Sequence, residues 1–352
     1  MRHSVIEWNG LLDKALSLRC SQKGQLVAEF ERQFAQYVGA RYAIAHCNGT
    51  ATMHSALVAL GVKPGDRVAV PPLTYASTTL AVLHAGAVPV FVDVEPKTWN
   101  MDPGLSFQVR SPKIPVSLYG LWSAHNLPED IDDAAETLNP HNHDVAFTSY
   151  SFEASKILPI GEGGMLVTDD EGLAWAARQF HTVGYRKNGP EDEGLLIPTR
   201  HPLSVRHDII GWNYQMSDIQ AAVGLMQLER ADELLNARRY SAECYRQAIQ
   251  GCEWITPQYV PEGWPHSYWT YGIALQSKEM WEPFAREIVS AGGEMPFGAF
   301  RLTYQEPAFR HLAPDGTCPI AEELQPRIMQ LQTNHDKAGA ELAATRLRLA
   351  LR

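Results

Sequence analysis

The sequence predicts an α/β protein with a mainly parallel sheet flanked by helices and a smaller α+β domain at the C-terminal end. Its 352 residues are 45% hydrophobic and 20% charged, so the chain can bury one large core and a second, smaller one. Strand-like and helix-like stretches alternate over residues 42–167, which is typical of parallel sheets. A long amphipathic stretch begins near Ser217, and a second group of strand-like and helix-like segments follows it.

The first half of the chain supplies the elements of the predicted sheet. Apolar residues at helical spacing predict a first helix over residues 25–37, and further helices are expected over 50–60 and 76–85. Pro89 suits only an early position in its strand, because it has no N–H to donate. In such a sheet, ligands bind at the carboxyl ends of the strands. The expected strands are residues 42–45, 67–70, 88–94, 114–118, 131–132, 145–149 and 164–167.

The second half of the chain predicts the smaller domain. Ser217 is expected to cap a long helix that runs to about Ile249, and the large domain is expected to end within that helix. The predicted division is a large domain over residues 1–235 and a small domain over 236–352. The small domain is expected to contain a strand and two helices, at residues 268–275, 278–291 and 338–351.

Composition excludes several classes of protein. The formal net charge of −10 argues against nucleic-acid and anionic-membrane partners, because both require clustered Lys and Arg. The five cysteines form no CxxC pair and no Cys/His cluster with metal-ligand spacing, so reduced thiols and no metal site are expected. No run approaches the ~20 apolar residues of a membrane span, and residues 1–10 lack the apolar region of a signal peptide. The sequence therefore predicts a cytoplasmic protein.

Two strand-to-helix junctions carry residues that suit a flat, phosphorylated ligand. Residues 48–52 include Gly49, Thr50 and Ala51, whose backbone N–H groups at a helix start can bind a phosphate. The same residues also suit an ordinary helix cap. Residues 72–75 end in Tyr75, whose ring can stack on a flat cofactor or pack in the core.

Two further junctions carry charged side chains. Asp133 and Glu136 follow a short strand, where a buried carboxylate is costly unless it pairs with a cation such as a protonated pyridine nitrogen. Acidic residues at such junctions also serve as helix caps. Ser151 and Lys156 follow the next strand and precede a glycine-rich turn at residues 161–164. A partly buried lysine is nucleophilic toward an aldehyde, whereas most lysines are solvated surface groups.

In this order the motifs resemble those of the DegT/DnrJ/EryC1/StrS aminotransferases, the sugar-aminating branch of the fold type I enzymes that use pyridoxal 5'-phosphate (PLP). The resemblance covers most of residues 24–235 and continues more thinly to residues 319–322. It implies an aspartate-aminotransferase-like fold. The matching segments are residues 48–51, 63–66, 71–75, 89–93, 133–136, 151–156, 161–164, 211–214, 220–222 and 227–228.

The resemblance also implies roles for single residues. Lys156 would hold PLP as a Schiff base and move a proton between the substrate carbon and the cofactor. Asp133 would pair with the pyridine nitrogen, Tyr75 would stack on the ring, and Glu136 would lie in the same site. These four residues would place the cofactor ring.

The phosphate of PLP would lie at the first helical junction. Gly49, Thr50 and Ala51 would bind it, mainly through backbone N–H groups, together with the hydroxyl of Ser151. Asn213 matches an asparagine that reaches the phosphate from the partner subunit. The resemblance therefore implies a homodimer.

The implied reaction transfers an amino group in two halves. Glutamate would convert PLP to pyridoxamine phosphate, which would then aminate a keto group on a nucleotide-linked sugar. Lys156 favours a transaminase over the related dehydratases, which carry His at that position. Glu136 and residues 268–271 resemble the GDP-perosamine synthase-like members, whose substrates are 4-keto-6-deoxysugars.

Some segments depart from the family pattern and leave alternatives open. Gln215 replaces a usual Arg or Lys, and residues 293–298 with Arg301 differ from the pattern near the substrate opening. One alternative is an aminotransferase acting on a keto-cyclitol or free keto-sugar, and another is a PLP-fold binding or regulatory protein without catalysis. The sequence does not determine the nucleotide, the sugar, the ring position, the pathway or any assembly beyond a dimer.

The chain also looks shortened at residues 104–112, 121–131 and 137–144, where a parallel crossover normally takes a dozen residues or more.

Overall fold

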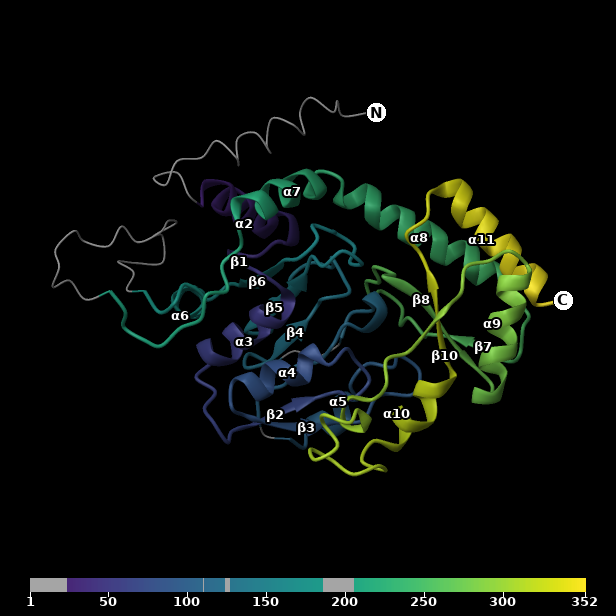
Figure 1. The fold of residues 1–352 in the computed structure, drawn as a ribbon, viewed down its shortest axis with the longest axis horizontal. Coiled ribbons are helices and arrows are strands. Elements are labelled where there is room, and N and C mark those ends of the chain that lie inside the picture. Colours follow the sequence, from purple (N-terminus) through teal and green to yellow (C-terminus); the bar gives the residue numbers. More distant parts are fainter. Residues whose placement is uncertain (1–23, 110, 124–126, 186–205) are drawn as a thin grey trace.

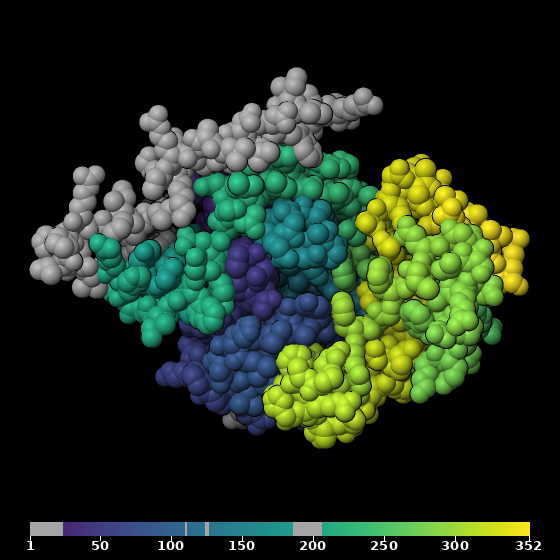
Figure 2. Space-filling model, in the orientation of Figure 1, coloured from purple at the N-terminus to yellow at the C-terminus, as the bar shows by residue number. Residues whose placement is uncertain are grey.

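The computed structural model of the protein describes residues 24–109, 111–123, 127–185 and 206–352. A sheet with helices on both faces is formed by the first part of the chain, and a smaller group of strands and helices packs beside it (Figure 1). In the space-filling view, a yellow-green segment of the second half of the chain lies directly against blue segments of the first half (Figure 2). The prediction of no signal peptide concerns residues that lie outside this description.

The larger sheet follows the predicted alternation. Its first four strands are β1 (Tyr42–His46), β6 (Gly164–Thr168), β5 (Phe147–Ser151) and β4 (Ile131–Asp133), in that order across the sheet. β6 is antiparallel to β1 and β5, and β4 is parallel to β5.

A parallel pair, β2 (Arg67–Val70) and β3 (Val88–Phe91), extends this sheet. Parallel bridges from Val116 to Asp133 and from Lys113 to Ala69 connect the pair to β4. The sheet is therefore mainly parallel, as predicted, with β6 reversed. Pro89 is the second residue of β3, which agrees with its expected early position.

The continuous strand expected at residues 114–118 was a wrong prediction. The segment makes one isolated bridge, at Val116, and the other bridge lies just before it, at Lys113; the chain then turns into the short 3-10 helix η2 (Leu118–Gly120). Pro112 and Pro115 have no N–H to donate, so the segment cannot form an uninterrupted ladder with its neighbours. It still lies between β2 and β4 and keeps the two halves of the sheet together.

Helices cover both faces of the larger sheet. On one face, α2 (Gln25–Val38) and α7 (Asp218–Leu228) pack around an aromatic core that includes Phe34 and Tyr150. On the other face, α3 (Gly49–Ala59), α4 (Ser77–His84) and α6 (Glu171–His181) pack around Phe147 and Leu166. Successive strand residues point to opposite faces, so burial of both faces explains the continuous apolar runs in these strands.

The segments after α7 form the α+β unit that the sequence predicts. An antiparallel sheet has the order β7 (Ile255–Pro257), β8 (Thr270–Leu275), β10 (Ile328–Gln332) and β9 (Phe297–Gly298). α11 (Lys337–Ala350) packs against α8 (Ala231–Ala248) and α9 (Trp281–Ser290) on this sheet. The remaining short helices are η3 (Lys278–Met280), η4 (Thr303–Gln305), α10 (Pro319–Leu324) and η5 (Gln325–Arg327).

The long helix expected over residues 217–249 is two helices, α7 and α8, separated at residues 229–230. Neither residue at the break is Gly or Pro. Leu235 belongs to the core under the larger sheet, and Ala242 belongs to the core of the smaller unit. The predicted domain boundary after residue 235 therefore falls inside α8, which contributes to both cores, and it stays a prediction.

Short links join several of the strands. The link from β4 to β5, residues 134–146, contains no helix, although the two strands are parallel. The described part of residues 121–130 also has no helix, and the described part of residues 104–112 contains only the end of α5 (Pro103–Ser106). Of the helices that the structure describes, none combines the length and the apolar character that a membrane crossing requires.

Candidate active site

A cavity of about 490 Å³ lies at the carboxyl ends of β4 and β5, beside the first turn of α3. Neither Ala51 nor Asn213 lines it. The fold thus gathers residues from four separate segments into one place, as the sequence predicts. The predicted residues that line the cavity are Gly49, Thr50, Tyr75, Asp133, Glu136, Ser151 and Lys156.

The first turn of α3 presents backbone groups to the cavity. The side-chain oxygen of Asn48 caps the helix and accepts the N–H of Ala51 at 2.8 Å, so the Ala51 N–H is engaged in the cap. The N–H groups of Gly49 and Thr50 belong to the first turn, where no intrahelical acceptor exists. A Cβ atom on Gly49 would lie 3.0 Å from the Cβ of Ser151, so the close approach of β5 favours glycine. This turn is both a capped helix start and a suitable anion site.

Two adjacent aspartates at the end of β4 point to opposite faces of the sheet. Asp133 faces the cavity, where its carboxylate accepts the Thr78 hydroxyl at 2.8 Å, and burial raises its pKa. Asp132 points away and accepts the hydroxyls of Ser117 and Ser123, each at 3.1 Å. Burial raises the pKa of Asp132 to about 7. A cation in the cavity would therefore pair with Asp133.

Lys156 and Glu136 form a buried ion pair in the cavity. The Nζ of Lys156 lies 3.9 Å from Oε1 of Glu136, and the two side chains are 14% and 6% exposed. The other carboxylate oxygen accepts the backbone N–H of Tyr119 at 2.6 Å. Burial raises the pKa of Glu136 to about 7, and the charge of Lys156 opposes that rise. The amine is therefore shielded from solvent, and the reading of Lys156 as a solvated surface group is wrong.

A tryptophan from the smaller unit completes the wall beside the lysine. The Nζ of Lys156 lies 4.3 Å from the centre of a Trp269 ring, a distance at which a cation is attracted to the ring face. The indole N–H of Trp269 donates to the carbonyl of Ser155 at 2.8 Å, which fixes the ring in place. Trp269 therefore joins the smaller unit to the loop that carries Ser155 and Lys156.

Tyr75 stands at the mouth of the cavity, with 55% of its surface exposed. Its ring meets Phe300 edge to face, with ring centres 5.2 Å apart. The alternative reading of Tyr75 as a core residue is therefore wrong. An exposed ring in this position can cover a flat ligand.

Sequence reasoning missed several residues of this site. Thr78 and Ser77 lie on α4, one turn after Tyr75, and Ser77 accepts the hydroxyl of Thr50 at 2.8 Å. The sequence pattern that could have pointed to them is a run of hydroxyl residues at the start of a helix. Such runs are also common in surface helices. Phe300 comes from a distant segment, and no local pattern pointed to it.

Comparison with known proteins identifies the family of this chain. A family model described as the DegT/DnrJ/EryC1/StrS aminotransferase family matches residues 7–344. The chain belongs to this family. The predicted family, the predicted fold and the prediction of an aminotransferase are thereby confirmed, and the reading as a protein without catalysis is not supported.

Characterised relatives share much of the chain. A GDP-perosamine synthase of Caulobacter vibrioides is 37% identical over 276 residues, which are 72% of this chain and 70% of the relative. A GDP-perosamine synthase of Escherichia coli O157:H7 is 33% identical over 74% of this chain and 72% of the relative.

Solved structures agree with the fold over nearly the whole chain. A 3-amino-5-hydroxybenzoic acid synthase superposes with a TM-score of 0.85 and 25% identity over 99% of this chain and 97% of the other. An aminotransferase from Psychrobacter cryohalolentis gives a TM-score of 0.82 and 26% identity over 99% of this chain and 96% of the other. The aminotransferase described here therefore shares both the large sheet and the smaller unit with these proteins.

Asn213 of this aminotransferase lies outside the cavity of its own chain. It is exposed, and its side-chain oxygen accepts the amide of Gln215 at 3.3 Å. Its backbone pairs with Thr182 after α6. A role for Asn213 in cofactor binding requires a second copy of the chain, and it stays a prediction.

Proposed function

We propose that this aminotransferase uses PLP to move an amino group from glutamate to the keto group of a nucleotide-linked 4-keto-6-deoxysugar. The observation that carries the proposal is the buried Lys156–Glu136 pair in a cavity that also holds Asp133 and the first turn of α3. The GDP-perosamine synthases among the relatives support the class of acceptor.

The residues of the cavity fit PLP. The first turn of α3 and the hydroxyl of Ser151 suit its phosphate, and the buried carboxylate of Asp133 suits its ring nitrogen. Tyr75 lies where a ring can be covered from solvent. When bound, PLP supplies an electron sink for the bonds at the carbon that carries the amino group. Thr78 would hold Asp133 in the orientation that this pairing needs.

Lys156 would attach the cofactor and carry the proton that the transfer requires. Its Nζ is shielded from solvent by Glu136 on one side and Trp269 on the other. Lys156 would accept and return a proton at Nζ during each turnover, beside the Glu136 carboxylate.

We also propose a homodimer in which Asn213 reaches the cofactor phosphate of the partner. Two inactive variants test this arrangement, Lys156→Ala and Asn213→Ala. When they are mixed and allowed to exchange subunits, each mixed dimer would contain one intact site, so activity should return. If the mixture stays as inactive as its components, Asn213 acts within its own chain. If Asn213→Ala is active on its own, Asn213 has no role.

The substrate proposal is tested with the purified protein, PLP and glutamate. A protein-bound visible absorption band should appear with PLP and disappear when glutamate is added. A panel of GDP- and UDP-linked 4-keto-6-deoxysugars should then restore the band, with formation of an aminosugar detected by mass spectrometry. Free keto-sugars and keto-cyclitols belong in the same panel, because turnover of those alone would favour the alternative substrate class. A protein that never binds PLP would overturn both.

A further inference from the structure

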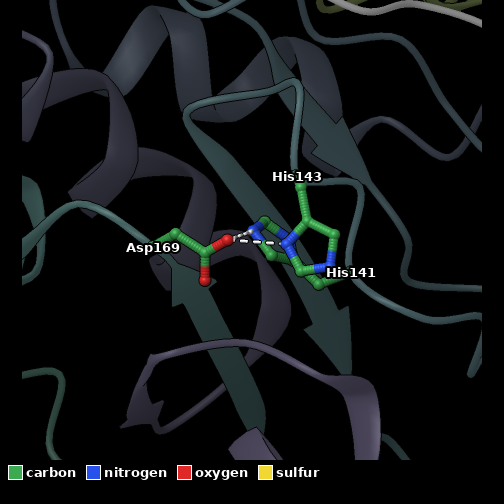
Figure 3. Close-up of side chains that lie close together, drawn as sticks. All are labelled: His141, His143 and Asp169. Carbon is green, nitrogen blue, oxygen red and sulfur yellow. Dashed lines mark hydrogen bonds and ion pairs between the residues drawn. The ribbon is translucent and has the colours of Figure 1, made fainter.

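Three potential metal ligands lie together at the edge of the larger sheet opposite the cavity, where β5 begins and β6 ends. His141 and His143 come from the link between β4 and β5, and Asp169 is the residue directly after β6 (Figure 3). One ligand atom from each side chain lies within 4.8 Å of the others. None of the three lines the cavity, so this cluster is separate from the proposed chemistry.

His141 has a buried ring nitrogen without a partner. The residue is 4% exposed, and its Nδ1 bonds to the hydroxyl of Thr148 at 2.8 Å. Its Nε2 is buried and has no hydrogen-bond partner among the described residues. Leaving a buried polar atom unsatisfied destabilises the folded state, so such an atom calls for an explanation.

The position of the His141 Nε2 atom, which faces Asp169, supplies an explanation. The Nε2 of His141 lies 3.9 Å from Oδ2 of Asp169, which is too far for a hydrogen bond. The Nδ1 of His143 lies 2.6 Å from the same oxygen, so both rings turn toward one carboxylate (Figure 3).

The distances between the ligand atoms are close to those around a tetrahedral metal ion. Zinc–ligand bonds of about 2.0–2.1 Å place the ligand atoms of a tetrahedral site roughly 3.3 Å apart. The two distances to Asp169 fall on either side of this value, and all three ligand atoms lie within 4.8 Å of one another, so side-chain rotations would bring them to this spacing. His143 and Asp169 are 61% and 32% exposed at their side chains, which leaves a route for an ion from solvent and room for a water ligand.

We propose that His141, His143 and Asp169 bind one Zn²⁺ ion, with water as the fourth ligand. Two supporting contacts are already present, as metal-binding residues usually require. The Thr148 hydroxyl orients the His141 ring, and the backbone N–H of Arg41 donates to the other oxygen of Asp169 at 2.8 Å. The sequence predicted no metal site, because one residue separates the histidines and Asp169 lies far along the chain.

The location indicates a structural role for this zinc site. The link that carries both histidines crosses between parallel strands without a helix, so few regular backbone hydrogen bonds hold it. An ion shared with Asp169 would tie that link to the end of β6. A ligand that binds only the folded state stabilises it in proportion to the logarithm of its concentration. Zinc should therefore change stability and leave turnover nearly unchanged.

The test uses the PLP-loaded full chain, with metal removed by chelation and ZnCl₂ added back. Calorimetry should detect one Zn²⁺ bound per chain, and the midpoint of thermal unfolding should rise by several degrees. Co²⁺ should give the visible absorption of a tetrahedral site, and Mg²⁺ should have no effect, because nitrogen ligands disfavour it.

Three variants make the assignment specific. His143→Ala and Asp169→Asn change partly exposed residues and should fold, yet each should weaken Zn²⁺ binding at least about tenfold. His311→Ala removes an exposed histidine elsewhere and should bind Zn²⁺ like the wild type. The proposal is overturned if the wild type binds no Zn²⁺, or if His143→Ala and the wild type give the same titration. A Co²⁺ spectrum that survives in His143→Ala would also overturn it.

Discussion

The amine of Lys156 lies 3.9 Å from the carboxylate of Glu136, and both side chains are shielded from solvent. Burial of the carboxylate raises the pKa of Glu136, and the neighbouring ammonium partly offsets that rise. The charge of Lys156 therefore favours the ionised form of Glu136. Replacement of Lys156 by a neutral residue removes the proposed attachment point and also leaves Glu136 without its cation.

Replacement of Lys156 by alanine should abolish covalent attachment of PLP and lower aminotransferase activity roughly 10²–10⁴-fold, because the proton carrier is lost. Borohydride treatment followed by peptide mass spectrometry checks the attachment. The wild type should carry a reduced cofactor on the peptide that contains Lys156. Lys63→Ala, at an exposed lysine, is the control and should label like the wild type. Labelling of another lysine in the wild type would sink the assignment.

The ordered motifs were sufficient to predict the fold and most of the candidate site. Gly49, Tyr75, Asp133 and Lys156 each follow a strand, and the carboxyl ends of parallel strands meet at one edge of a sheet. Their meeting in one cavity was therefore predictable from the order of the elements.

The rest of the site depends on contacts between distant segments. Trp269 and Phe300 reach the cavity only because the smaller unit packs against the larger sheet, and no local pattern encodes that packing. The opposite directions of Asp132 and Asp133 follow from the two-residue repeat of a strand, so they could have been predicted. The cluster of His141 and Asp169 could not, because it depends on how β5 and β6 pair.

Asp132→Asn should reduce the pH dependence of stability. The folded chain keeps the Asp132 proton up to about pH 7, whereas the unfolded chain releases it near pH 4. Between these values the folded state binds more protons, so the free energy of unfolding falls as pH rises, by up to about 1.4 kcal/mol per pH unit. Urea unfolding from pH 5 to pH 8 measures this slope.

The slope should be smaller in Asp132→Asn, which keeps an acceptor for the hydroxyls of Ser117 and Ser123. Glu282→Gln changes a carboxylate that is 77% exposed and should keep the wild-type slope. Equal slopes in the wild type and Asp132→Asn would show that Asp132 is ionised in the folded state over this range.

Arg178→Ala should destabilise the protein by about 3 kcal/mol, because it leaves the buried Glu31 carboxylate without its cation. Arg178 on α6 donates to both oxygens of Glu31 on α2, at 3.0 and 2.9 Å. Arg286→Ala breaks a pair that is 75% and 77% exposed and should cost less than about 0.5 kcal/mol. Urea unfolding measures both values, and equal effects would contradict the importance of the buried pair.

Gly164→Ala should displace the first turn of α3, which is the proposed phosphate site. A Cβ atom on Gly164 would lie 2.7 Å from the backbone carbon and oxygen of Asn48 and 2.9 Å from the nitrogen of Gly49. These are backbone atoms that a side-chain rotation cannot move, so the first turn of α3 must shift. We expect PLP to bind at least about tenfold more weakly and the free energy of unfolding to fall by about 1–3 kcal/mol.

Gly172→Ala is the control, because its Cβ would meet only a side-chain oxygen of Asp170 at 3.2 Å. Titration with PLP, followed by absorbance, separates the two variants. Wild-type affinity in Gly164→Ala would mean that the first turn of α3 does not hold the phosphate.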